Sequence, residues 1–114
     1  MLTINCSIDE NGNFIESSNG NGSVESGGIV KWVVTGSRLD TISISPKIVS
    51  ATGDSAIWAI APRPYPDNTP PKVSKNWQGT VIETTTIVGE SYDIGHVANS
   101  GASGSHDPRI SVNP

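Results

Sequence analysis

Apolar residues in this chain recur at every second position, in short runs separated by turn-forming residues. Segment 2–8 alternates Leu, Ile, Cys and Ile with polar neighbours, and segment 41–45 alternates in the same way. Because successive side chains of a strand point to opposite faces, this period of two predicts half-buried β-strands. Serine, glycine, threonine and asparagine make up 46 of the 114 residues and leucine occurs only twice, so strong helix formers are scarce.

Further strands are expected at 29–35, 56–60, 91–96 and 109–112, with the longest at 80–88. Asn-Gly pairs between residues 11 and 22 are strong hairpin signals. The prolines from Pro62 to Pro71 predict an extended surface loop rather than sheet. We therefore expect one all-β domain over 1–114, an antiparallel β-sandwich. The side chains expected to face inward are Leu2, Ile4, Val30, Trp32, Ile42, Ile44, Trp58, Ile82, Tyr92, Ile94, Ile110 and Val112.

Two parts of the chain resemble the cupredoxin family, the Greek-key sandwich of the small blue copper proteins. Residues 28–34 followed by 40–44 resemble that family's strand with a V-x-W/F centre, its first ligand position and the V/I-x-I after it. Residues 89–96, the loop after them and 109–112 resemble its G-x-Y-x-F/Y-x-Cys approach, ligand loop and closing I-x-V strand. The resemblance implies a cupredoxin-like Greek-key order, and an immunoglobulin-like order of the same strands is the alternative.

The ligand positions depart from the family pattern. Asp40 stands where the first histidine is expected, His96 stands at the cysteine position, and no methionine follows His106 in the ligand loop. A blue copper centre needs a thiolate together with two imidazoles. The single thiol, Cys6, belongs to the first strand and is expected to be a small buried side chain. The resemblance therefore implies a sandwich without the blue copper site, and no cofactor is expected.

Charge and hydropathy narrow the possible partners and location. The net charge is -4 and the basic residues are dispersed, which argues against nucleic acid. No apolar run is long enough for membrane insertion. The first residues lack the pattern of a signal peptide, so a cytoplasmic location is expected if the chain is full length. The sequence sets no oligomeric state.

The sequence favours a non-enzymatic binding or structural module. The Pro-rich loop 62–78 carries two aromatic residues next to amides and single charges, a combination that suits a glycan or a protein partner. Its candidate ligand-binding residues are Tyr65, Asp67, Asn68, Asn76 and Trp77. The alternative is a metal-binding cupredoxin-like protein that uses Asp40, His96 and His106, since a carboxylate and two imidazoles suit several divalent metals. For His96, a half-buried structural role on the face of Tyr92 and Ile94 is the competing interpretation.

Overall fold

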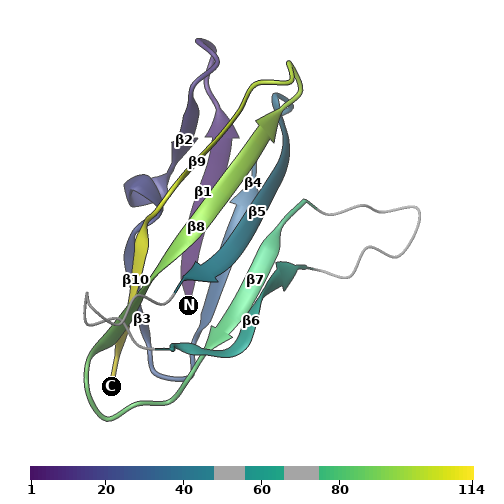
Figure 1. Ribbon diagram of the computed structural model, residues 1–114. Helices are drawn as coiled ribbons and strands as arrows, with labels where there is room; N and C mark the ends of the chain where they lie inside the picture. Colours follow the sequence, from purple (N-terminus) through teal and green to yellow (C-terminus); the bar gives the residue numbers. More distant parts are fainter. Residues whose placement is uncertain (48–55, 66–74) are drawn as a thin grey trace.

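The computed structural model describes residues 1–47, 56–65 and 75–114 of the chain. These residues form two β-sheets that pack face to face (Figure 1). Sheet A has the order β2-β1-β4-β7-β6, with bounds Phe14–Glu16, Leu2–Ile8, Ile29–Val34, Trp77–Val81 and Trp58–Pro64. Sheet B has the order β3-β10-β8-β5, with bounds Gly22–Glu25, Arg109–Asn113, Val88–Ala98 and Leu39–Lys47. A further strand, β9 (Ser103–His106), pairs with β8 in sheet B. The predicted all-β sandwich is confirmed.

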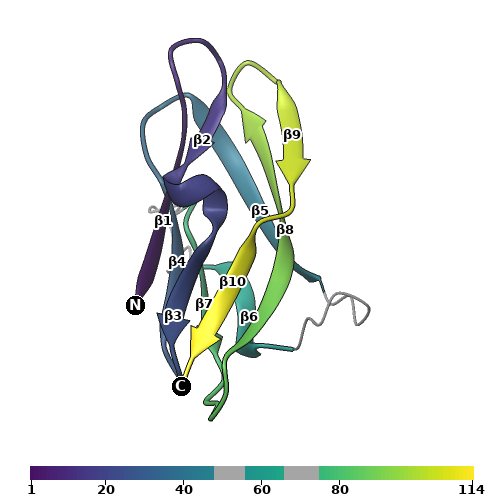
Figure 2. The same ribbon diagram turned by 90° about the vertical axis from the view of Figure 1, so that its left-hand side faces the viewer.

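Both sheets are mixed, whereas a purely antiparallel sandwich was expected. β1 runs parallel to β4, and β3 runs parallel to β10. The physical reason lies in the short 3₁₀ turn η1 (Ser17–Gly20), which follows the β1–β2 hairpin. There the chain leaves sheet A and enters sheet B as β3, so β4 returns to sheet A in the direction of β1. β2–η1–β3 and β9–β10 run along the same side of the sandwich (Figure 2).

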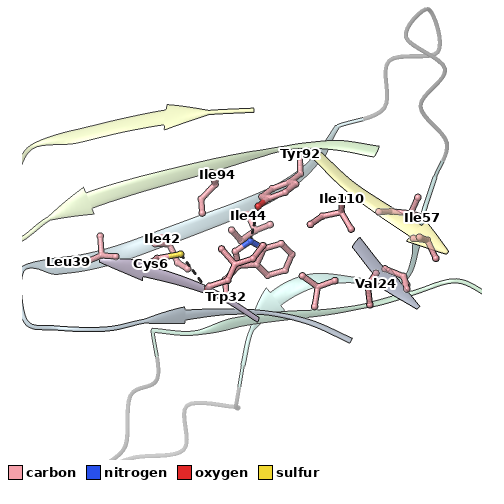
Figure 3. Close-up of a cluster of buried hydrophobic side chains, with 14 of the residues drawn as sticks. Cys6, Val24, Trp32, Leu39, Ile42, Ile44, Ile57, Tyr92, Ile94 and Ile110 are labelled. Atoms are coloured by element: carbon pink, nitrogen blue, oxygen red, sulfur yellow. Dashed lines mark hydrogen bonds between the residues drawn. The ribbon is translucent and has the colours of Figure 1, made fainter. Parts of the chain in front are cut away.

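The core lies between the sheets and consists of alternating side chains from both (Figure 3). Nine of the twelve side chains expected to face inward are buried: Ile4, Val30, Trp32, Ile42, Ile44, Tyr92, Ile94, Ile110 and Val112. Leu2 and Trp58 are partly buried and pack against this core, and Ile82 is of intermediate exposure. A shift in register between Leu39 and Thr41 lets both Leu39 and Ile42 face inward despite their odd spacing. Cys6 is buried, as predicted.

Two expected elements differ from the structure. The β-branched run 80–88 is not one strand, because β7 ends at Val81 in sheet A and β8 begins at Val88 in sheet B. A uniform β-branched run does not reveal where a chain changes sheets. Pro62 and Pro64 belong to strand β6 rather than to a loop. β6 is an edge strand of sheet A. An edge strand tolerates proline, which has no backbone N–H, because one side of the strand forms no hydrogen bonds with a neighbouring strand.

Candidate functional site

The base of the 62–78 loop, whose two ends belong to β6 and β7, is held by backbone and side-chain hydrogen bonds. The backbone N–H of Tyr65 donates to the carbonyl of Asn76 at 2.8 Å, which closes the ends of β6 and β7. The side-chain oxygen of Asn76 accepts from the backbone N–H of Val34 at 2.9 Å. This Asn76 oxygen therefore connects the loop base to β4. The Tyr65 side chain is 39% exposed at this base.

Trp77 has a different environment from Tyr65. It is the first residue of β7, where it pairs in register with Trp32 of β4 and Pro64 of β6. The side chain is half-buried and packs against the core. Trp77 thus anchors the loop, and Tyr65 is the more exposed of the two predicted aromatic residues. The other two predicted ligand-binding residues, Asp67 and Asn68, lie outside the described residues.

Of the alternative metal set, the structure brings together the two histidines but not Asp40. Asp40 lies near Lys75, with Oδ1 3.8 Å from Nζ. His96 and His106 line one pocket, and Asp40 is not part of that lining. Within residues 1–47, 56–65 and 75–114, no three His, Cys, Asp or Glu side chains form a group that could hold a metal ion.

The pocket shared by the two histidines lies between β2 of sheet A and β8 and β9 of sheet B. Its volume is about 480 Å³. The Phe14 ring stacks on the His96 ring, with centroids 4.2 Å apart and planes 4° from parallel. His96 is half-buried on the face that carries Tyr92 and Ile94. Burial, and to a lesser extent the nearby His106, lowers the pKa of His96. This geometry agrees with the structural interpretation of His96.

A buried carboxylate lies beside this stacked pair. Glu16 ends β2, where it pairs in register with Cys6 of β1, and its side chain is only 3% exposed. It forms an ion pair with Nε2 of His106, which also lies 3.3 Å from the Asn19 carbonyl oxygen. Burial raises the pKa of Glu16, while the charge of His106 and its hydrogen bond act in the opposite direction. The Glu16–His106 pair therefore joins a strand of sheet A to a strand of sheet B.

Sequence reasoning did not single out Glu16, although a signal was present. Glu16 is two residues from Phe14, so a strand at 14–16 places both side chains on one face. Residues two apart in a strand lie on the same face, so Glu90 lies with Tyr92 on the inward face of β8. Glu90 is 1% exposed. Burial raises its pKa, and the Trp58 indole and the Ile57 backbone lower that pKa in part.

Comparison of the chain with models of known protein families, with curated proteins and with solved structures gave no significant match. No helix in the described part of the chain is long and apolar enough to span a membrane.

Proposed function

We propose that this protein is a non-catalytic binding module on a cupredoxin-like sandwich that lacks the blue copper ligand set. The segments that carry the resemblance fall on β4, β5, β8 and β10. Inward residues of all four strands, among them Trp32, Ile42, Tyr92 and Ile110, belong to the core. A rigid sandwich with recognition carried by its loops is a common division of roles in such proteins.

The observation that supports binding through the 62–78 loop is the exposed Tyr65 on a fixed base. Its backbone is bonded to Asn76, and Asn76 in turn is bonded to β4. Because the Tyr65 backbone is already ordered in this way, a partner does not have to order it on binding, so more of the contact energy contributes to affinity. A tyrosine ring offers a flat apolar face and a polar edge, which suits both a glycan and a protein surface.

The test is a glycan array and a pull-down with the wild-type chain, Tyr65→Ala and Ile87→Ala. Ile87 is a matched control because it is 72% exposed and lies in the β7–β8 connection, beyond the Val81 end of β7, whereas Tyr65 is at the Trp77 end. We expect Tyr65→Ala to weaken binding and Ile87→Ala to leave it unchanged. Equal binding by all three folded proteins, or no binding by the wild type, contradicts the proposal. Trp77→Ala is less informative because that side chain also packs against the core.

The absence of blue copper chemistry is part of the same proposal. The only thiol of the chain, Cys6, is buried on β1 opposite Glu16. His96, at the position expected for the thiolate, is stacked on Phe14. We expect protein purified without chelator or tag to contain no stoichiometric copper by metal analysis. Copper that is lost in His96→Ala or His106→Ala would instead favour the metal-binding alternative.

A further inference from the structure

Three Asn-Gly pairs lie close together in the chain, at residues 11–12, 19–20 and 21–22. In this pair asparagine loses its side-chain amide most readily, because glycine has no Cβ to obstruct the approach of its backbone nitrogen. The three pairs share this sequence but differ in their surroundings in the folded protein. We propose that Asn11 is a site of spontaneous deamidation in the folded protein, and that the fold protects Asn19 and Asn21 from the same reaction.

The reaction needs only the chain and solvent. The backbone nitrogen of the glycine loses its proton to base in the solvent and attacks the side-chain carbonyl carbon of the asparagine. The new C–N bond closes a succinimide ring, and the side-chain nitrogen takes up a proton and leaves as ammonia. Water then opens the ring at either carbonyl and gives aspartate or isoaspartate. Each conversion therefore adds a negative charge at neutral pH, and isoaspartate also routes the backbone through the side-chain carbons.

Asn11 meets the requirements of this reaction. It lies in the turn between β1 and β2, at the end of the sandwich away from both termini (Figure 2), and both Asn11 and Gly12 are exposed. Within the described part of the chain, the Asn11 side chain forms no hydrogen bond. No atom beyond the adjacent residues lies within 4 Å of the Cβ position at Gly12, so the ring has room to form. The Gly12 N–H donates to the Asp9 carbonyl at 3.1 Å, and a single bond in an exposed turn opens at a low free-energy cost.

The Asn21 side chain is held at both ends of its amide. Its Oδ1 accepts from the backbone N–H of Arg109 at 2.8 Å, and its Nδ2 donates to the carbonyl of Ser18 at 3.2 Å. Gly22 is the first residue of β3, and a Cβ there would lie 2.7 Å from the Leu2 side chain. Ring closure at Asn21 must therefore break both hydrogen bonds and move the side chain toward a closely packed glycine.

Asn19 is protected through the glycine that follows it. Asn19 itself is exposed, but Gly20 is buried. A Cβ at Gly20 would lie 2.7 Å from Oε2 of Glu16 and 2.8 Å from Cγ of Pro108. The carbonyl oxygen of Asn19, which belongs to the same peptide unit as the Gly20 nitrogen, lies 3.3 Å from Nε2 of His106. The peptide unit that must rotate for ring closure is therefore fixed by its packing.

The test is incubation of the folded wild-type protein at pH 8, followed over time by mass spectrometry. Cleavage after glutamate yields peptides 11–16 and 17–25, which separates Asn11 from Asn19 and Asn21, and fragmentation then assigns each converted residue. The same digestion of protein that was not incubated gives the background. We expect conversion at Asn11 to be about tenfold faster or more than at Asn21, because two hydrogen bonds hold the Asn21 side chain. The same order is expected for Asn11 and Asn19.

Two controls separate the effect of the fold from that of the sequence. In denaturing guanidinium chloride, where the fold is lost, all three asparagines are expected to convert at similar rates. Asn11→Gln keeps an exposed amide at this position but requires a larger ring, and it is expected to abolish conversion at residue 11. The proposal is overturned if Asn11 stays intact in the folded protein, or if Asn19 or Asn21 converts as fast as Asn11. It is also overturned if Asn11 leads by the same factor in denaturant.

Discussion

Trp32 and Tyr92 connect the two sheets through a buried hydrogen bond in the middle of the core. The indole Nε1 of Trp32 on β4 donates to the hydroxyl of Tyr92 on β8 at 3.1 Å. The Tyr92 hydroxyl in turn donates to the carbonyl of Gly20 at 2.5 Å. The two rings meet edge to face, 5.3 Å apart and at 69°, and point toward one another across the core (Figure 3). One hydroxyl thus ties sheet A, sheet B and the η1 crossing together.

Tyr92→Phe should destabilise the protein by about 1–3 kcal/mol. The substitution keeps the ring but leaves the Trp32 N–H and the Gly20 carbonyl without this partner in a region closed to water. The measurement is the free energy of unfolding in urea, with near-ultraviolet circular dichroism to establish that the native packing persists. A Tyr92→Phe protein as stable as the wild type would show that these two polar groups find other partners.

Gly20→Ala should cost more stability than Gly12→Ala. Both glycines have positive φ, +79° and +82°, so an alanine at either position is strained by about 1–2 kcal/mol. At Gly20 the added Cβ also meets Oε2 of Glu16 at 2.7 Å and Cγ of Pro108 at 2.8 Å, whereas at Gly12 nothing lies within 4 Å. Overpacking of this kind adds about 1–3 kcal/mol. Urea unfolding of both variants gives the difference, and equal losses would contradict the close packing at η1.

The period-two pattern was sufficient to predict most of the core. It placed Ile4, Ile42, Ile94 and Val112 on inward faces because a strand with one buried face must alternate. It failed at 80–88, where every residue but one is apolar or β-branched and no alternation marks the change of sheet. The parallel pairs were missed for a related reason. Strand patterns carry no information about which neighbour a strand acquires after a crossing such as η1.

The candidate site was predicted only in part, because residue types do not reveal which neighbours use their polar atoms. Tyr65 is exposed, as a binding residue should be, but the side-chain oxygen of Asn76 is bonded to Val34. The sequence highlighted His96 and His106 for metal binding, and the structure places Phe14 and Glu16 against them. These contacts join positions about 80–90 residues apart, a separation at which sequence spacing has no predictive value.

Cys6 should be inert toward thiol reagents until the protein unfolds. The side chain is fully buried, and its pKa of about 12 leaves almost no thiolate at neutral pH. Modification with a chromogenic disulfide reagent at pH 8 is expected to be negligible in buffer and complete in strong denaturant, where the same thiol serves as its own control. Rapid reaction in buffer would show that β1 opens locally at the position of Cys6.

Glu90→Gln should stabilise the protein, and the gain should grow with pH. Glu90 is 1% exposed on the inward face of β8, and burial raises the pKa of its carboxyl. A raised pKa means that its contribution to stability is complete below the unfolded pKa of about 4.3 and is lost as the pH rises through the folded value.

The wild type and Glu90→Gln should therefore have similar free energies of unfolding near pH 4. At pH 8 these free energies should differ by about 1–3 kcal/mol, in favour of the amide. Urea unfolding across this range measures the difference, with Glu83→Gln, which removes an exposed carboxylate, as the control substitution. Because Glu16 is present in all three proteins, its own pH dependence cancels in the comparison. A Glu90→Gln protein that is less stable than the wild type at pH 8 would show instead that the ionised carboxylate makes a favourable contact in the folded state.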